Sequence, residues 1–317
     1  MNKWVDTSQG IAGAVLAASI GDALGAPYEG DPEFGALVAT RPVIDYRPRI
    51  RYEPGSYSGG SELLLIQISG IVNASDRWQE DTAERLCGWV LQGARAGLTT
   101  QAAVVRLRSD KPWTESGVER GPQGTAGLMR SAAAALASAD DPSAAAELAR
   151  EACLITHRWV ESLTAARILG YALASLVSSE GIHPYDAVNE ACRRAGPGLM
   201  AQRVYRALEL AEGPATDEGA VAELGKSSHV HEAFPVAVYF AVKYAGDIAT
   251  TLSHCAWRTS QGDTDSICFL AGLIAGATAG TIGIPGAWLS ALRHRELLQR
   301  AALKLQLCPQ IRTAGVP

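Results

Sequence analysis

The sequence lacks several features that mark easily recognised protein classes. Its 317 residues carry 28 Lys and Arg against 33 Asp and Glu, a net charge of −5, so it has no basic excess for gripping a nucleic-acid backbone. We therefore expect no nucleic-acid partner. The six cysteines lie far apart and form no C-x-x-C pair, which excludes the common zinc spacings and a small disulfide scaffold. Reduced, mostly buried thiols in a cytoplasmic protein are the simplest interpretation.

Targeting signals are also missing. The first six residues include an acid and lead into no apolar core behind a basic stretch, so we expect no signal peptide. Residues 266–292 carry no charge, and Gly272, Gly276 and Gly280 have the spacing of packed membrane helices. This segment is nevertheless rich in Gly, Ala and Thr, contains Pro285 and begins beside two aspartates. We expect a helix buried in a helical core, and no membrane partner.

Helical periodicity dominates what is present. Hydrophobic residues make up 47% of the chain, enough for a large core, and clean period-2 alternation is absent. No composition shift or repeat divides the sequence, so we expect one all-α domain over residues 1–317, a compact multi-helix bundle. The pattern predicts helices at 11–24, 62–72, 82–94, 127–137, 143–158, 162–178, 184–194, 199–210, 233–244, 248–256, 266–279 and 288–306. The predicted loops are 29–60, with room for a short strand or lid, 109–124, 212–230 and 259–265.

The most informative loop is the last, which contains Asp263, Thr264 and Asp265 and leads into Ser266. Two carboxylates two positions apart, followed by a hydroxyl, make a compact set of oxygen ligands of the kind that Mg²⁺ prefers. Such a sequence can also serve as a simple helix N-cap. Here the aspartates lead into the most apolar helix of the chain, where a charge needs a partner or a metal.

Four other segments combine polar groups with turns. Residues 21–29 place Asp22 in an apolar run and end in Glu29, which alone indicates a capped helix end with a surface acid. Residues 57–62 suggest a Gly-Gly turn before a helix capped by Ser61. The glycine-rich stretch 121–130 is either an ordinary turn or an anion-binding helix start, and lacks the lysine of a P-loop. His157 follows Thr156, where a histidine is commonly a cap or core residue.

Taken together and in this order, these segments resemble the ADP-ribosylglycohydrolase family, the all-helical group named for the dinitrogenase reductase-activating glycohydrolase. Residues 21–29 are similar to the end of the family's first helix. Gly-Asp-Thr-Asp-Ser at 262–266 is similar to its Gly-Gly-Asp-Thr-Asp-Thr motif, with Gln261 in place of the first glycine. The 121–130 loop and the Thr-His pair also fall in register, so the likeness spans nearly the whole chain.

The resemblance implies a cleft for ADP-ribose with a binuclear Mg²⁺ or Mn²⁺ centre, in which the bond from ribose C1″ to an arginine, serine or other acceptor is hydrolysed. It assigns Asp263, Asp265 and Glu29 as the catalytic acids. Asp263, Asp265 and Ser266 become metal ligands. The implied substrate-binding residues are Gly121, Pro122, Gln123, Gly124, Thr125, His157 and Ser58.

The sequence departs from the family at residues 58–61. Where the family has Thr-Asp-Asp-Thr, this chain has Ser58, Gly59, Gly60 and Ser61, so two carboxylates are lost. Glu62 cannot replace them, because a shift of two positions at a helix start turns its side chain elsewhere. We therefore expect one weakly held Mg²⁺ ion or none, and no organic cofactor.

Two functions stay open on the sequence alone. The first is an enzyme of altered chemistry that acts on the ribosyl N- or O-glycosidic bond of an ADP-ribosylated or NAD-derived substrate. The second is an inactive module that binds ADP-ribose. The expected partners are an ADP-ribosyl or NAD-derived small molecule and an ADP-ribosylated protein, with the chain a monomer or small homo-oligomer.

Overall fold

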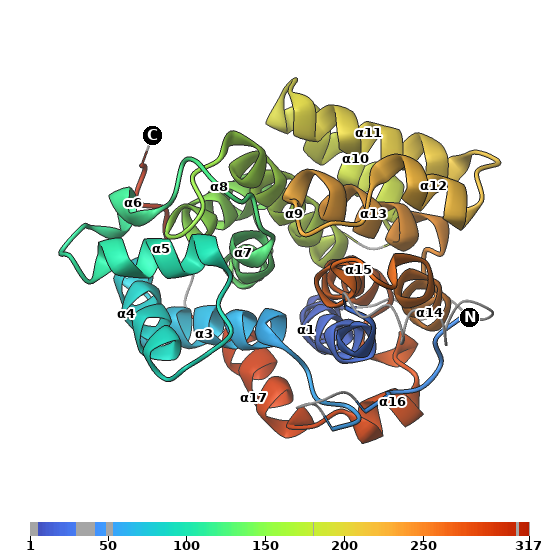
Figure 1. Cartoon of the computed structure of the whole chain (residues 1–317), viewed down its shortest axis with the longest axis horizontal. Helices are drawn as coiled ribbons and strands as arrows, with labels where there is room; N and C mark the ends of the chain where they lie inside the picture. The colour runs from blue at the N-terminus through green and yellow to red at the C-terminus, as the bar shows by residue number, and fades with distance from the viewer. Residues whose placement is uncertain (1–5, 30–41, 49–52, 180, 309–310, 317) are drawn as a thin grey trace.

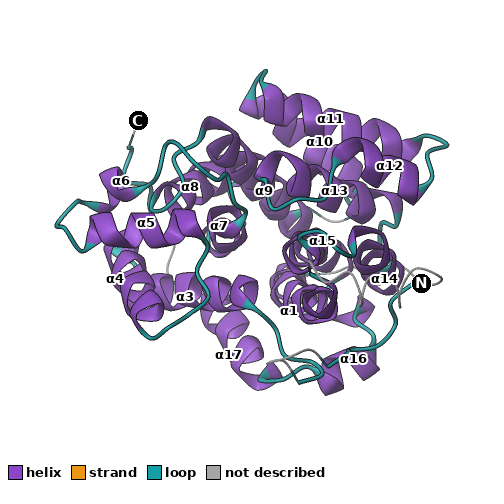
Figure 2. Ribbon diagram, viewed as in Figure 1, coloured by secondary structure: helices purple, strands orange, loops and turns teal. Residues whose placement is uncertain are grey.

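The computed structural model of the chain describes residues 6–29, 42–48, 53–179, 181–308 and 311–316, and these residues are helical with no strand (Figure 2). The predicted all-α class is confirmed, whereas a single domain over 1–317 stays a prediction. The helices, in chain order, are α1 (Thr7–Gly25), η1 (Ala26–Tyr28), α3 (Gly59–Asn73), α4 (Trp78–Leu91), α5 (Leu98–Leu107), α6 (Trp113–Ser116), α7 (Ala126–Leu136), α8 (Pro142–Leu154), α9 (Val160–Ser178), α10 (Pro184–Ala195), α11 (Leu199–Glu212), α12 (Asp217–Leu224), α13 (Val230–Lys243), α14 (Ile248–Thr259), α15 (Thr264–Ala279), η2 (Thr281–Gly283), α16 (Gly286–Ala291) and α17 (Arg295–Gln306).

Helices α1 and α15 form the centre of the molecule, and the other helices surround this pair (Figure 1). Their backbones touch because glycine stands at the crossing points. A Cβ atom on Gly21 would lie 2.2 Å from the carbonyl oxygen of Cys268, and one on Gly276 would lie 2.2 Å from that of Gly13. The predicted burial of this helix is confirmed, because α15 is buried from Thr264 to Ala277.

Polar side chains cap the starts of several helices. The Asp141 carboxylate accepts hydrogen bonds from the backbone N–H groups of Ser143 and Ala144, each at 3.0 Å, and so caps α8. His183 caps α10 through its Nδ1, which accepts from Tyr185 N at 3.2 Å. Proline follows each cap as the first helical residue, where its missing N–H costs no hydrogen bond.

Several predicted boundaries are wrong. The 212–230 loop contains α12, which Thr216 caps by accepting from Gly219 N at 3.2 Å. The 288–306 helix is divided into α16 and α17, because Arg293 N donates to Gly55 O at 3.0 Å and His294 takes a left-handed φ of 55°. The loop prediction for 109–124 missed α6, and no helix was predicted at α5.

The 57–62 segment is not a Gly-Gly turn. Helix α3 begins at Gly59, so both glycines lie in its first turn, and Ser58 rather than Ser61 is the N-cap residue. Residues 30–41 and 49–52 of the 29–60 loop, where a short strand or lid was predicted, and the first five residues lie outside the described residues. The described parts of that loop, 42–48 and 53–58, contain no strand.

The charge-free segment ends earlier than a membrane span requires, because α15 stops at Ala279. Two other helical stretches, Thr7–Tyr28 and Val160–Ser178, are long and apolar enough to cross a bilayer by length and composition alone. Of their apolar windows, 94% and 67% are buried inside the protein, and core helices meet the same criterion.

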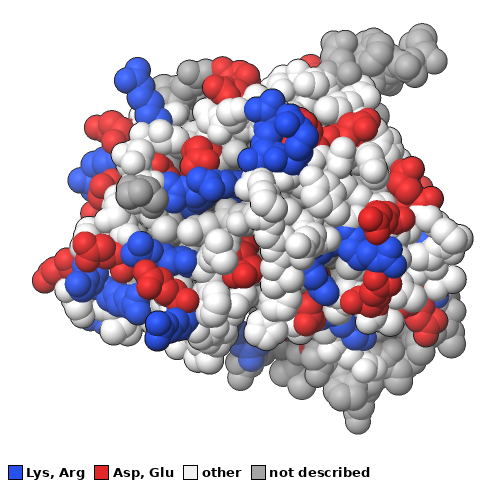
Figure 3. Space-filling view, turned by 90° about the horizontal axis from the view of Figure 1, so that it is seen from above, with Lys and Arg blue, Asp and Glu red and all other residues white. Residues whose placement is uncertain are grey.

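The surface and the cysteines agree with the sequence analysis. On the face drawn in Figure 3, basic and acidic side chains are interspersed among the described residues. All six thiols are free, and four of them, Cys153, Cys192, Cys255 and Cys268, are buried.

The glycine contact between α1 and α15 makes a prediction about stability. Gly276→Ala should destabilise the protein by about 2–3 kcal/mol, because the new methyl group meets backbone rather than a movable side chain. Gly88→Ala in α4, with nothing within 4 Å of its Cβ position, should stabilise by about 0.5–1 kcal/mol. Urea unfolding of both variants measures their free energies of unfolding. Equal changes in the two variants would contradict the conclusion that the close contact between α1 and α15 requires glycine at position 276.

Candidate functional site

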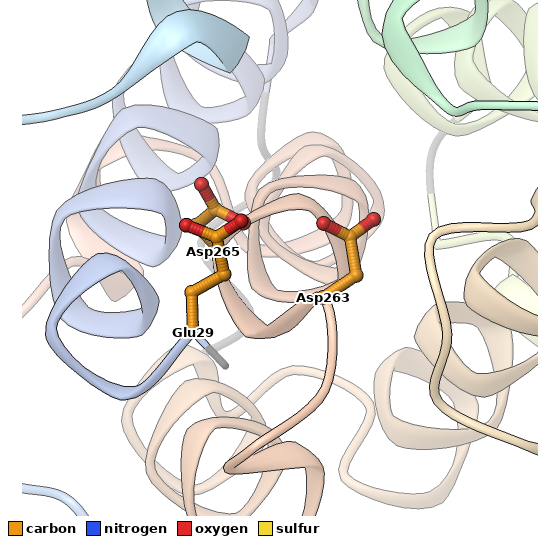
Figure 4. A group of neighbouring side chains, drawn as sticks. All are labelled: Glu29, Asp263 and Asp265. Carbon is orange, nitrogen blue, oxygen red and sulfur yellow. The ribbon is translucent and has the colours of Figure 1, made fainter. Parts of the chain in front are cut away.

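Three carboxylates meet where α1 ends and α15 begins. Glu29, Asp263 and Asp265 each offer one oxygen, and these atoms lie within 4.8 Å of one another. Figure 4 shows the three side chains pointing to the same side, with Glu29 and Asp265 adjacent. Glu29 is far from Asp263 and Asp265 along the chain, and the fold brings it to them.

The close approach of α1 and α15 sets this geometry. A Cβ atom on Gly25 would lie 2.7 Å from the Cα of Asp265, so the end of α1 rests against the first turn of α15. Tyr28 O accepts from Gln261 N at 2.9 Å, which joins the segment before Glu29 to the segment before Asp263. Gln261, in the position of the family's first glycine, has a φ of 71°, a region that favours glycine.

Asp22 is a further acid of this site, for which the sequence alone indicated only a capped helix end. It is fully buried and accepts hydrogen bonds from Ser58 N at 2.8 Å, from Ser61 N at 2.9 Å and from Ser61 Oγ at 2.7 Å. Its carboxylate therefore binds the N-terminus of α3, where unpaired N–H groups favour a negative charge. The signal in the sequence was an aspartate inside an otherwise apolar helix.

Ser58 connects this network to the acid cluster. Its Oγ donates to Asp265 Oδ2 at 2.9 Å, while Asp265 Oδ1 accepts from Ser266 N at 2.7 Å. Asp265 is thus held from both sides by α3 and α15. Glu62, in contrast, accepts from Trp89 Nε1 at 2.8 Å, in agreement with the prediction that it turns away from the lost carboxylates.

Burial and mutual repulsion make these acids hard to ionise together. Burial, followed by Asp265 and Glu29, raises the pKa of Asp263 well above its usual range, against hydrogen bonds from Ser266 and Thr125. Burial and the charge of Asp265 raise the pKa of Asp22 to about 7, although Ser58 and Ser61 donate to it. Shared protons or a bound cation must therefore offset the repulsion between these carboxylates.

The acids line one side of a pocket of about 390 Å³. Of the substrate-binding residues implied by the sequence, Ser58, Pro122, Gly124, Thr125 and His157 line it as well. Gly121 and Gln123 do not line it: the carbonyl of Gln123 instead accepts from Val230 N at 2.8 Å and fixes the loop to α13.

Sequence reasoning missed a second wall of this pocket, formed by α4, α5 and the segment before α13. Thr99 and Thr100, in the first turn of α5, lie there, and Thr99 Oγ1 donates to the carbonyl of Pro122. The Gly-Leu-Thr-Thr sequence could have signalled this helix start, because glycine is acceptable as an N-cap. The missed lining residues are Leu63, Trp89, Arg95, Gly97, Leu98, Thr99, Thr100, Ala126, Met129 and Ser228.

His157 is held neutral beneath the pocket. Its Nδ1 lies 2.7 Å from Thr156 Oγ1, which accepts from the buried Arg130 guanidinium at 3.0 Å. Burial and the charge of Arg130 lower the pKa of His157 to about 3. Because the ring stays uncharged at neutral pH, it can position a substrate but carries no positive charge for a phosphate.

The donor set fits one divalent cation. Glu29, Asp263 and Asp265 supply carboxylate oxygens within reach of a single hard ion, and the Ser266 hydroxyl is next to Asp263. On the α3 side of the pocket, Gly59 and Gly60 offer no side-chain ligand. The Cβ position of Gly60 is also crowded, 3.0 Å from Met129 Sδ and 3.3 Å from Asp22 Oδ2.

The fold and this site can be set beside known proteins. A sequence profile described as ADP-ribosylglycohydrolase matches residues 5–314. This chain belongs to the ADP-ribosylglycohydrolase family.

Two curated relatives and one solved structure extend the family match. An uncharacterised protein of Archaeoglobus fulgidus is 28% identical and covers 92% of this chain and 94% of its own length. The ADP-ribosyl-[dinitrogen reductase] glycohydrolase of Rhodospirillum rubrum is 24% identical, covering 88% and 89%. A solved structure described as an ADP-ribosylglycohydrolase-related protein complex has a TM-score of 0.73 and 25% identity, covering 95% of this chain and 98% of its own. Membership in this family of glycohydrolases supports a glycohydrolase-like function for the chain.

The buried histidine predicts a pH effect on stability. The folded state keeps His157 neutral down to about pH 3, whereas the unfolded chain takes up a proton near its ordinary value of 6.5. The contribution of His157 is therefore complete above pH 6.5 and is lost as the pH falls, by about 1.4 kcal/mol per pH unit.

His157→Gln keeps a neutral polar side chain and should remove this slope. The measurement is the difference in unfolding free energy between wild type and variant, taken from pH 7.5 to 4.5. A difference that does not change with pH would show that His157 is not held neutral.

Proposed function

We propose that this protein binds the ADP-ribosyl group and cleaves the ribosyl N- or O-glycosidic bond of an ADP-ribosylated or NAD-derived substrate, with a metal centre reduced to one position. The observation that carries the proposal is the convergence of Glu29, Asp263 and Asp265 in one pocket. Family membership supports the ribosyl substrate. The unusual element is the loss of the second pair of acids, at Gly59 and Gly60.

The two walls of the pocket would bind different parts of the substrate. The acids would face the ribose and C1″, where an oxocarbenium-like transition state develops positive charge that nearby carboxylates stabilise. The opposite wall, from Pro122 to Thr125 and around Thr99, would hold the diphosphate through backbone N–H groups and hydroxyls. Arg95, which also lines the pocket, supplies a positive charge on that side.

A divalent cation would be held by Glu29, Asp263, Asp265 and Ser266, where it would act as a Lewis acid for the ribose hydroxyls. The remaining steps depend on the protein. Water adds its oxygen to C1″ as the glycosidic bond breaks, and one carboxylate accepts the water proton. The leaving nitrogen or oxygen takes the bonding electron pair and, where it needs one, a proton from a protonated acid of the cluster. Ser58 keeps the carboxylate of Asp265 aimed at this position by its 2.9 Å hydrogen bond.

A binding function without turnover is the second candidate. The segment around Ser58 favours binding without turnover. Ser58 donates a hydrogen bond to Asp265, and the two residues after Ser58 are glycines where the family pattern has aspartates. The pocket wall for the diphosphate would be unaffected by that change. ADP-ribose binding with no cleavage of any ribosyl conjugate would identify this function.

The acid cluster predicts how activity and cation binding change together. Asp265→Asn should lower kcat/KM for a ribosyl conjugate by roughly 10²–10³-fold, because it removes charge stabilisation at C1″, while ADP-ribose affinity changes less. The variant should also lose the single Mg²⁺ or Mn²⁺ site that calorimetry is expected to detect in the wild type.

The matched control is Asp110→Asn, an exposed aspartate outside the pocket with a φ of 59°, which asparagine tolerates. It should leave activity and cation binding unchanged. ADP-ribosyl-arginine, ADP-ribosyl-serine and NAD are the substrates to assay, with and without Mg²⁺. No binding and no turnover with any of them would end the proposal.

The two glycines of α3 predict opposite outcomes. The Cβ position of Gly59 meets only Trp89 at 3.9 Å, so Gly59→Asp should fold and add a ligand that raises cation affinity about tenfold or more. Gly60→Asp should destabilise the protein by about 1–3 kcal/mol, because Met129 and the Asp22 carboxylate already fill that space. The unfolding temperature of each variant is measured with and without Mn²⁺. If Mn²⁺ raised it equally in both variants, Gly59 would not be the position where a metal ligand can be added.

A further inference from the structure

The two ring nitrogens of His157 have different surroundings. Nδ1 lies 2.7 Å from Thr156 Oγ1, and a Cβ atom on Gly127 would lie 2.8 Å from it, so this edge of the ring packs against α7. Nε2 lies 3.8 Å from the Cβ position of Gly124, which lines the pocket together with His157. Nε2 is therefore the ring nitrogen beside the pocket.

A buried arginine holds the hydroxyl that contacts Nδ1. Arg130 of α7 is fully buried, and its Nη2 donates to the carbonyl of Ala152 at 2.6 Å and to Thr156 Oγ1 at 3.0 Å. Within the described part of the chain, its Nε and Nη1 have no hydrogen-bond partner. The hydroxyl of Thr156 is thus one of two acceptors that fix the position of the guanidinium.

The proton of the Thr156 hydroxyl determines which tautomer His157 adopts. Arginine can only donate, so Thr156 Oγ1 accepts from Arg130. Thr156 is fully buried, and among the described residues the only other partner of its hydroxyl is His157 Nδ1. If Nδ1 carried the ring proton, the hydroxyl proton would have no acceptor, which is costly in a buried site. Thr156 therefore donates to Nδ1, and the proton of the neutral ring is on Nε2.

We propose that Thr156, held by Arg130, is a positioning residue that fixes the proton of His157 on Nε2, so that His157 donates a hydrogen bond to an oxygen of the bound ADP-ribosyl group. The inference rests on the proposed function, because it assigns a contact within the same pocket. Gly124 belongs to the wall proposed for the diphosphate. The acceptor is accordingly a diphosphate oxygen or a hydroxyl oxygen of the adjoining ribose.

The same arrangement excludes His157 from proton transfer. Its Nδ1 already accepts from Thr156, and its Nε2 already carries a proton. Burial and the charge of Arg130 lower the pKa of the ring to about 3, so it gains no second proton at neutral pH. In the opposite tautomer, Nε2 would present a lone pair that repels the ligand oxygen. Proton transfer at C1″ is thereby left to the carboxylates of the cluster.

The tautomer is tested in the free wild-type protein by the ¹⁵N resonances of the histidine rings. A ring nitrogen that carries a proton and one that does not give well-separated signals, and those of His157 are the ones that His157→Gln removes from the set of six histidines. We expect the proton on Nε2 and a shift of the Nε2 signal when ADP-ribose binds. A proton on Nδ1, or an Nε2 signal that bound ADP-ribose does not move, would overturn the inference.

Thr156→Val removes the hydroxyl and keeps the shape of the side chain, so both tautomers become accessible. ADP-ribose should bind this variant about tenfold more weakly, and Thr156→Ser, which keeps the hydroxyl, should stay within about threefold of the wild type with its ring signals unchanged. ADP, which lacks the second ribose, locates the acceptor. Thr156→Val weakens ADP as well if the acceptor is a phosphate oxygen, and weakens only ADP-ribose if it is a ribose oxygen.

Ser131→Ala is the matched control, because Ser131 is a buried residue of α7 whose Oγ donates to Leu128 O at 2.7 Å, outside the pocket. It should change neither the His157 signals nor ADP-ribose affinity. If Thr156→Val weakens ADP-ribose without changing the tautomer, or changes neither, Thr156 is not a positioning residue. The wild-type spectrum decides the tautomer even if Thr156→Val does not fold. ADP-ribose binding by the wild type would leave the proposed function standing in each of these cases, whereas no binding would end both.

Discussion

The contact between the backbones of α1 and α15 is the constraint on which the rest of the structure depends. Glycine at the crossing points lets the two helices approach until carbonyl oxygens nearly meet the facing Cα atoms. The end of α1 then rests on the start of α15, and Glu29 stands beside Asp265. A side chain at Gly25 would push these acids apart. The same feature that buries a nearly charge-free helix therefore also builds the acid cluster at its N-terminus.

The hydrogen-bond network around Asp22 explains how the cluster stays ordered with so few ligands. Asp22 holds the N-terminus of α3, and α3 in turn presents Ser58 to Asp265. In the family pattern, two aspartates would stand between these serines. Here the connection from α1 to α15 runs through hydroxyl and backbone donors, which fix direction without adding negative charge. This arrangement leaves open space at Gly59, where Trp89 is the nearest side chain.

The helical class, the motif register and the acids were predictable from the sequence, whereas part of the site was not. Glu29, Asp263, Asp265 and Ser58 carried local signals, because each sits at a helix end within a recognisable motif. Trp89 carried none, because an aromatic residue on an amphipathic helix is ordinarily part of the core. The division between α16 and α17 could not be predicted from the local sequence either, because it depends on a hydrogen bond to Gly55, more than 200 residues away in the chain.

By itself, the sequence determined that the chain is all-α, that it belongs with the ADP-ribosylglycohydrolases, and that two expected acids are glycines. Those properties follow from periodicity and residue identity, which need no coordinates. Only the tertiary structure decided that Asp22 binds the start of α3, that Gly59 has free space while Gly60 is crowded, and that Trp89 reaches the pocket. The physical reason is that each depends on distances between helices, which arise from packing of segments far apart in the chain.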